Sequence, residues 1–408
     1  MKKVSNKRLE SKRLDQLGSA IFAEVEEWKL EARALDKDII DLGIGSPDLS
    51  PSPMIVQALQ LAVGNSANYH YPSSEGSIEF RTKAAEWLNW RFGVEVDPVY
   101  EILTLMGTQD GLAHLTLAIC DPGDIALLPD PGYPIYAGGL ALAGVEPYYM
   151  PLRSENDYLP RLDLIPADIA NRAKFMLLNY PSNPLASIAD LTFFEEVVQY
   201  GRKHDLLIVH DLAYCEMAFE GFRPPSILSI SGAMDIAVEF HSLSKSFNMA
   251  GCRIGFMAGR SDVVQALRRL KSNIDYGVFK AVQAAGIVAL EEDMKSEGSS
   301  VADIYERRRD IFLEQIMLAG WNIPVPKPLA TMFVWVPIPV GWTSRQISRE
   351  ILLETGVVVI PGDAFGQEGE GFVRIALVQE EARLIEAARR IGSWYDIWSR
   401  GFDEVAMD

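Results

Sequence analysis

The segment HSLSKSFNMAGCRIG, residues 241–255, contains the densest group of candidate functional residues in this chain. It follows an apolar run at 236–240 that predicts a buried strand. Its serines and glycines predict a loop at the carboxyl end of a sheet, where open α/β sheets bind ligands. Within it, Ser242, Lys245 and Arg253 supply a hydroxyl, an amine and a guanidinium. This set suits an aldehyde cofactor that carries a phosphate. A lysine in a surface loop is the alternative, which an isolated Ser-x-x-Lys would favour.

Short apolar runs bounded by Gly, Pro, Asn or Asp alternate with helical patterns between about residues 100 and 260. Runs of this length predict buried parallel strands, and apolar residues at helical spacing, as at 191–204, predict the helices between them. The predicted parallel strands are 125–128, 174–179, 206–210, 236–240 and 255–258.

The pattern changes near residue 278. It is helical over 278–318, with the basic triplet 307–309 on a predicted exposed face. We predict an α/β protein with a large domain, 50–285, built on a mostly parallel sheet, and a smaller α+β domain from 1–49 and 286–408. The elements expected in the smaller domain are strands 332–336, 357–360 and 372–377 and helices 344–354 and 380–391.

The composition limits the classes of function. The 408 residues carry a formal charge of −18, which argues against a nucleic-acid partner. Three widely spaced cysteines predict no disulfide framework, and five scattered histidines have no metal-ligand spacing. No apolar run approaches the ~20 residues of a membrane span, and the basic N-terminus lacks the apolar core of a signal peptide. We therefore expect no metal, no membrane partner and a cytoplasmic location.

Two further motifs follow predicted strands. In HDLAYCE, residues 210–216, Asp211 ends a strand and Tyr214 lies three residues further on. A buried carboxylate needs a cationic partner, which a protonated pyridine nitrogen would provide; the alternative is a helix N-cap. In NYPSNP, residues 179–184, the Asn183 amide would donate to an oxygen on the cofactor ring; the alternative is a turn alone.

Two further motifs supply a predicted helix N-terminus and an aromatic side chain. In MGTQDG, residues 106–111, the helical pattern that follows places Thr108 and Gln109 at a helix N-terminus, which binds anions. In DPGYPIY, residues 130–136, Tyr133 suits stacking on a flat ring. A proline-rich turn with an aromatic plug is the alternative there.

Arg374 lies among apolar residues in GFVRIALV, residues 371–378. A buried arginine is costly unless it meets an anion, and its planar fork matches an α-carboxylate. The alternatives are a half-exposed edge strand or an ion pair with a structural acid.

Together these strings resemble the fold-type I aminotransferases of class I/II, the aspartate aminotransferase-like superfamily. The resemblance implies pyridoxal 5′-phosphate (PLP) as cofactor and a homodimer with shared active sites. It also implies ping-pong transfer of an amino group between an L-amino acid and a 2-oxo acid. The matching strings, in chain order, are DLGIGSPD, YPSSEG, GTQDG, DPGYP, NYPSNP, HDLAY, SLSKSFNMAGCRIG and FVRIAL.

The resemblance implies a role for each motif residue. Lys245 holds the cofactor covalently and moves the substrate α-proton, and Asp211 pairs with the ring nitrogen. Tyr214, also expected to be catalytic, and Asn183 contact the ring oxygen, while Tyr133 stacks on the ring face. The phosphate ligands are expected to be Thr108, Gln109, Ser242, Arg253 and, across a dimer, Tyr71 of the partner subunit. The substrate ligands are expected to be Arg374, Asn183 and the backbone of Gly45.

Two short segments of the sequence bear on the choice of substrate. The segments 68–76 and 275–279 (DYGVF) look similar to alanine (glutamate–pyruvate) and to LL-diaminopimelate aminotransferases. The latter usually carry Glu two residues before the glycine of Tyr-x-x-x-x-Gly, where this chain has Ser74, followed by Glu75. Tyr276 stands where a long dicarboxylate would call for a smaller polar residue. We therefore expect alanine and glutamate, with LL-diaminopimelate as the alternative.

Two other classes share these motifs. A PLP-dependent carbon–sulfur β-lyase would keep nearly all of them, because fold does not settle reaction. It would release pyruvate and ammonia without an oxo-acid acceptor. A non-catalytic regulatory member is the other alternative, against which the intact Lys245 argues.

Overall fold

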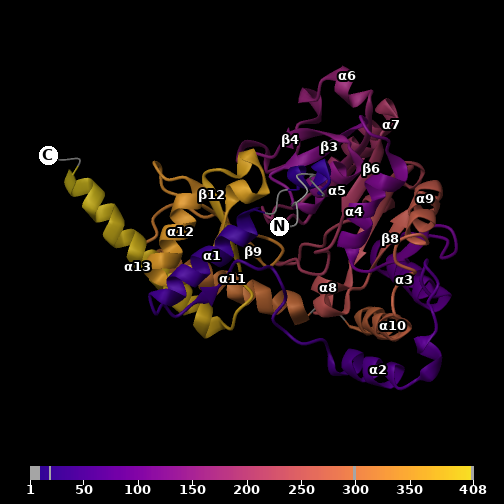
Figure 1. Ribbon diagram of the computed structural model, residues 1–408, viewed down its shortest axis with the longest axis horizontal. Helices are drawn as coiled ribbons and strands as arrows, with labels where there is room; N and C mark the ends of the chain where they lie inside the picture. Colours follow the sequence, from indigo (N-terminus) through magenta and orange to yellow (C-terminus); the bar gives the residue numbers. More distant parts are fainter. Residues whose placement is uncertain (1–9, 18–19, 297–299, 406–408) are drawn as a thin grey trace, which may run out of the picture.

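The computed structural model describes residues 10–17, 20–296 and 300–405. Figure 1 shows two packed parts, the larger built around a seven-stranded sheet of order β2-β8-β7-β6-β5-β3-β4. Apolar residues fill these strands, which are buried between helices as the short apolar runs predict. The strands are β2 (Ile102–Leu105), β3 (Ile125–Asp130), β4 (Glu146–Pro151), β5 (Ala173–Asn179), β6 (Leu207–Asp211), β7 (Ala237–Ser242) and β8 (Gly255–Gly259).

Within this sheet β8 runs against the other strands, because it pairs antiparallel with both β7 and β2. The predicted α/β sheet is therefore confirmed as mostly parallel, but the prediction of a parallel strand at 255–258 is wrong. A parallel pair needs a crossover along the sheet, usually through a helix. The connection 243–254 instead contains α8 (Leu243–Ser246), a single helical turn. Strand β7 also runs two residues further than predicted, so His241 and Ser242 belong to the strand rather than to a loop.

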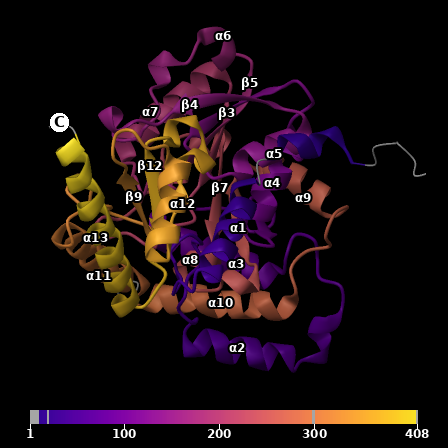
Figure 2. The ribbon, with the colours of Figure 1, turned by 60° about the vertical axis from the view of Figure 1, so that its left-hand side comes forward.

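Two helical layers cover the sheet. Neighbouring strand residues point to opposite faces, so that Ile208 joins one hydrophobic core and Val209 joins the other. The first core is covered by α3 (Ile78–Phe92), α7 (Leu191–His204) and α10 (Lys280–Lys295), and the second by α4 (Thr108–Ile119), α5 (Ile135–Ala143) and α9 (Ser261–Lys271). Figure 2 shows α2 (Pro53–Val63) outside these layers, packed on α10, and α6 (Ala167–Ala170) at the opposite end.

The smaller part combines both ends of the chain. Strand β1 (Ile40–Asp41) pairs with β10 (Val357–Val358), and β11-β12-β9 forms an antiparallel sheet. The predicted strand 357–360 is thus divided between two sheets. The remaining elements are β9 (Phe333–Pro337), β11 (Ile360–Pro361), β12 (Phe372–Ala376), α1 (Ala20–Ala34), α11 (Ser300–Leu318), α12 (Ser344–Thr355) and α13 (Glu381–Val405).

The predicted boundary after residue 285 falls inside α10, which packs on α2 and α3 of the larger part. We therefore propose that the division between the two parts follows α10. The first fifty residues contact both parts. A short 3-10 helix at Lys12–Gln16 contacts α5 of the larger part, whereas α1 packs on α12 of the smaller part.

The prediction of an exposed face at 307–309 is correct for Arg307, which is exposed, and wrong for Arg308 and Arg309. Arg308 is buried and donates to both carboxylate oxygens of Asp48, at 2.7 and 2.8 Å. Arg309 is buried as well and pairs with Glu220 at 2.9 Å. Acids that lie far away in the sequence offset the cost of burying these charges. In the described ranges, no helix has both the length and the apolar composition needed to cross a bilayer, and the cytoplasmic location stays a prediction.

Candidate active site

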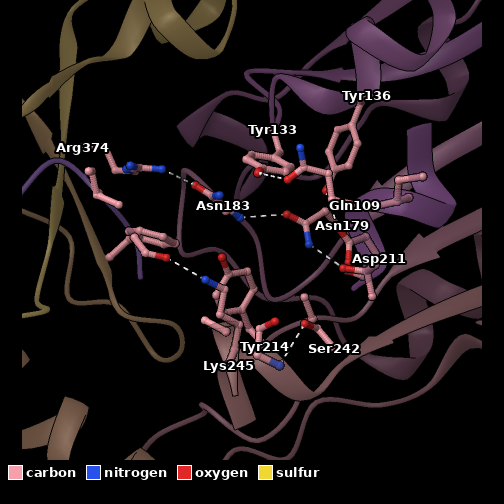
Figure 3. Close-up of a pocket in the computed structure, with 18 of the residues that line it drawn as sticks. Gln109, Tyr133, Tyr136, Asn179, Asn183, Asp211, Tyr214, Ser242, Lys245 and Arg374 are labelled. Carbon is pink, nitrogen blue, oxygen red and sulfur yellow. Dashed lines mark hydrogen bonds between the residues drawn. The ribbon is translucent and has the colours of Figure 1, made fainter. Parts of the chain in front are cut away.

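A pocket lies at the carboxyl ends of β5, β6 and β7, facing the smaller part (Figure 3). Tyr71 is the one predicted site residue that does not line it. The other lining residues, to which the sequence had assigned no site role, are Ile44, Leu112, Tyr136, Asn179, Ala213, Ser244, Ala250 and Phe333. The predicted residues that the fold brings together there are Gly45, Thr108, Gln109, Tyr133, Asn183, Asp211, Tyr214, Ser242, Lys245, Arg253 and Arg374.

Lys245 projects from α8, directly after β7. Its Nζ donates to the carbonyl oxygen of Gly45 at 2.7 Å. Burial lowers the pKa of Lys245, and the positive charges of Arg374 and Arg253 lower it further, to about 8. More of the amine is therefore neutral and nucleophilic near neutral pH than in an exposed lysine.

Asp211 is the last residue of β6 and is buried. Its Oδ2 accepts a hydrogen bond from the Tyr136 hydroxyl at 2.7 Å, whereas Oδ1 has no partner among the described residues. Burial raises the pKa of Asp211, and the Tyr136 hydrogen bond and the charge of His210 oppose that shift. The alternative of a helix N-cap is wrong, because turns rather than a helix follow β6. The open oxygen can accept from a cationic N–H donor.

A chain of amides connects Asp211 with the smaller part (Figure 3). Asn179 Nδ2 donates to the backbone oxygen of Asp211, and its Oδ1 accepts from the Asn183 N–H, both at 2.8 Å. Asn183 Oδ1 in turn accepts from Arg374 Nη1 at 2.9 Å. The motif NYPSNP is therefore more than a turn, since it couples the β5 end to β12.

Arg374 lies on β12, the central strand of its sheet, and is 4% exposed. Its guanidinium carbon lies 4.5 and 4.7 Å from the ring centres of Phe333 and Phe365. Its Nη atoms donate to the Asn183 amide and the Gly43 carbonyl, and its Nε has no partner in the described part of the chain. Both alternatives, an exposed edge strand and a structural acid, are therefore wrong. Burial lowers the pKa of Arg374 to about 10, so it remains a cation at neutral pH.

The start of α4 forms an anion-binding corner. Its N-cap, Gly107, has φ of +75° and no side-chain cap, so the first amides of the helix remain free to donate. The Arg253 guanidinium lies so close that a Cβ at position 107 would meet its nitrogen at 2.5 Å. The Ser242 hydroxyl accepts from the Ser244 N–H at 3.2 Å and caps α8 beside this corner.

The three tyrosines predicted to contact the cofactor lie in different places. Tyr133 and Tyr214 line the pocket; the Tyr133 hydroxyl donates to Gln109 at 3.2 Å, and burial raises the pKa of Tyr214. Tyr71 lies outside it, 85% exposed, with its ring centre 5.4 Å from that of Tyr276.

These groups fit a phosphorylated pyridine aldehyde. The Asp211 oxygen without a donor matches a protonated ring nitrogen, and the Lys245 amine matches an aldehyde. The free amides of α4 and Arg253 match a phosphate. The described residues contain no cluster of His, Cys, Asp or Glu side chains suited to a metal ion.

Comparison with known proteins places the chain in a family. The model for aminotransferase class I and II matches residues 37–391. The chain belongs to this family. Like its members, it is a PLP-dependent aminotransferase with amino acid and oxo acid substrates, which confirms the fold class, enzyme class and cofactor predicted from the motifs.

Individual relatives cover almost the whole chain. An LL-diaminopimelate aminotransferase of Moorella thermoacetica is 45% identical over 94% of this chain and 97% of its own length. One from Syntrophobacter fumaroxidans is 46% identical over 94% and 98%. Among solved structures, substrate-bound BacF from Bacillus subtilis superposes with a TM-score of 0.89 at 33% identity, covering 95% of this chain and 98% of BacF. A probable N-succinyldiaminopimelate aminotransferase from Thermus thermophilus gives 0.85 at 38% identity, covering 91% and 99%.

The crowding at Gly107 gives a test of the anion-binding corner in this aminotransferase. Gly107→Ala adds a Cβ that must displace Arg253, so we expect the PLP dissociation constant to rise at least ~10-fold. Gly123→Ala is the matched control, since Gly123 also has positive φ but open space around its Cβ. Both variants should lose roughly 1–3 kcal/mol of stability to backbone strain at positive φ. Equal PLP affinity in the two variants would contradict the role of this corner.

Proposed function

We propose that this pocket transfers the amino group of an L-amino acid to a 2-oxo acid by a ping-pong mechanism, with PLP held covalently on Lys245. One observation carries the proposal: the buried amine of lowered pKa and the open oxygen of Asp211 line the same pocket. Family membership supports the cofactor, and these two groups match its aldehyde and its ring nitrogen.

The remaining pocket residues divide between the two ends of the cofactor. Around the ring, Asn183 and Tyr214 would contact the ring oxygen and Tyr133 would cover one face. At the other end, Thr108, Gln109, Ser242 and Arg253 would bind the phosphate. The absence of a side-chain cap at the start of α4 and the closeness of Arg253 to Gly107 support this assignment.

The substrate carboxylate is assigned to Arg374. Its Nε has no partner among the described residues, and its desolvated guanidinium offers a planar fork. Asn183 orients this fork through its hydrogen bond to Nη1. The Gly45 carbonyl already accepts from Lys245, which leaves the Gly45 N–H as the group assigned to the carboxylate.

In the reaction, bound PLP supplies an aldehyde and a ring that withdraws electrons from the substrate α-carbon. Lys245 Nζ, released when the substrate amine replaces it on the cofactor, would take the α-proton and return it, and its lowered pKa suits that exchange. Asp211 keeps a negative charge beside the ring nitrogen, and Tyr136 holds that carboxylate in place. Arg374 fixes the substrate by its carboxylate in both half-reactions, so that donor and acceptor react in the same orientation.

Lys245 is the first test. The purified protein should be yellow, and borohydride reduction should fix PLP to Lys245, seen by peptide mass spectrometry. Lys245→Ala should keep bound PLP and lose transamination, while Lys174→Ala, at an exposed lysine, should behave as wild type. Finding the reduced cofactor on another lysine would overturn the assignment.

Asp211 is the second test. Asp211→Asn removes the anion that keeps the ring nitrogen protonated, so kcat should fall at least ~10²-fold, as for other well-placed electrostatic groups. Asp163→Asn, an exposed control, should leave kcat unchanged. A kcat for Asp211→Asn within about twofold of wild type would contradict the role.

We further propose that the enzyme acts as a homodimer. Tyr71 and Tyr276 are exposed and lie against each other, and a second exposed pair, Tyr69 with Phe279, has ring centres 5.5 Å apart. Aromatic residues in such groups are typical of protein interfaces. A second copy would cover them, with the partner subunit's Tyr71 contributing to the phosphate site.

For the substrate we propose alanine, ahead of glutamate. The cations that line the described pocket are Lys245, Arg253 and Arg374, of which the first two are assigned to the cofactor, and Asp211 is its acid. Glu75 is engaged elsewhere, by Arg81 at 3.2 Å and by Arg268. A charged distal group therefore has no free partner within this lining, and a short neutral side chain is favoured.

LL-diaminopimelate is the second candidate, because relatives at 45% and 46% identity carry that name. Its distal end would depend on groups supplied across the proposed dimer.

A donor panel decides between them. In the donor half-reaction, measured without an acceptor, alanine should give a kcat/KM at least ~10-fold above that of LL-diaminopimelate, whose second charged end lacks a partner. A clear preference for LL-diaminopimelate would overturn the proposed substrate and leave the enzyme class, an aminotransferase, unchanged. Pyruvate and ammonia formed from cystathionine without an acceptor would instead identify a β-lyase.

A further inference from the structure

Lys271 is the last residue of α9, whose last turn is rich in basic residues, and its side chain is fully buried. Its Nζ donates to Asp110 Oδ2 and to Asp275 Oδ2, both at 2.6 Å. A single buried ammonium therefore serves two carboxylates, whose side chains are 10% and 14% exposed. No step of the proposed reaction uses this cluster.

Asp110 lies in the first turn of α4, two residues after Thr108. Its Oδ2 also accepts from the Met106 N–H at 3.0 Å, and its Oδ1 hydrogen-bonds with the His114 ring at 2.8 Å. Burial alone would raise the pKa of Asp110, but His114 and Lys271 overcome it and lower the pKa to about 2. Asp110 is therefore an anion at the helix end that is assigned to the cofactor phosphate.

Two anions at one helix end repel each other, and burial strengthens that repulsion. The free amides of α4 and Arg253 favour a phosphate, whereas the Asp110 carboxylate opposes it unless its charge is cancelled. Lys271 places a positive charge in direct contact with the Asp110 carboxylate and shares that charge with Asp275.

Asp275, the second partner of Lys271, is itself held in place by a hydrogen bond. Asp275 Oδ1 accepts from the Gly277 N–H at 2.7 Å. Gly277 has φ of +97°, and a Cβ there would meet the Ser73 carbonyl at 2.5 Å. Asp275 thus belongs to a closely packed loop that holds the ammonium toward α4.

We propose that Lys271 is a positioning residue for the cofactor phosphate and that it acts by offsetting the negative charge of Asp110 at the start of α4. The inference rests on the proposed function, since it requires the phosphate to bind at that helix end.

The test compares two ligands that differ by the phosphate alone, PLP and pyridoxal, titrated into the full-length chain after removal of its cofactor. Lys271→Met should raise the dissociation constant of PLP at least ~10-fold and that of pyridoxal less than ~2-fold, because only the former bears the repelled charge. Arg269→Met, which removes an exposed charge from the same helix, should change neither by more than ~2-fold.

The double variant separates charge from structure. If Lys271 acts through Asp110, Asp110→Asn combined with Lys271→Met should restore PLP affinity to within about threefold of wild type. A loss of affinity for both ligands in Lys271→Met, or a double variant as weak as the single one, would assign Lys271 a structural role and overturn the proposal. Unchanged PLP affinity in Lys271→Met would also overturn it.

Asp110→Asn alone keeps the test decisive if Lys271→Met does not fold. It removes the opposing charge and keeps the ammonium, so PLP should bind more tightly; weaker binding would overturn the proposal. Failure of the proposed function is recognised separately, because wild-type protein would then show no preference for PLP over pyridoxal and no borohydride-fixed cofactor on Lys245.

Discussion

The site depends on a carboxylate held where water cannot reach it. Asp211 ends a strand that is buried on both faces, and the Tyr136 hydroxyl satisfies only one of its oxygens. A protein can keep such a group ionised only if a cation completes its surroundings. The parallel sheet provides the position, because β5 pairs Asn179 with Asp211 at the end of β6. Strand β7 pairs Phe240 with Asp211 and ends two residues further on, at Ser242.

Both ends of the chain complete this position from outside the sheet. Gly45, close to the start, accepts a hydrogen bond from Lys245, and Arg374, close to the end, reaches Asn183. Packing β1 beside β10 brings the two segments together, since it pairs residue 40 with residue 357. The larger part alone therefore lacks four residues of the pocket lining, which are Ile44, Gly45, Phe333 and Arg374.

Motifs at strand ends were predictable from the sequence, because turn residues and apolar runs locate each end without knowledge of the whole fold. The direction of β8 was not, since it depends on the path of its connection rather than on its composition. Tyr136 and Asn179 lay within quoted motifs, but their partners become visible only when strands far apart in sequence are placed together. Arg308 and Lys271 were hidden for a related reason: each is neutralised by an acid distant in sequence, so a charged residue on a helix looks exposed until its partner is known.

The short connection from β7 to β8 has a consequence for how this chain can vary. Lys245 and Arg253, proposed for opposite ends of the cofactor, both lie between two paired strands whose register is fixed on each side. An insertion or deletion between residues 243 and 254 would change the spacing of the two groups, with no neighbouring loop to absorb it. Surface turns such as 121–124 have no such constraint. Length variation among natural homologues should therefore avoid this connection even where its residues differ.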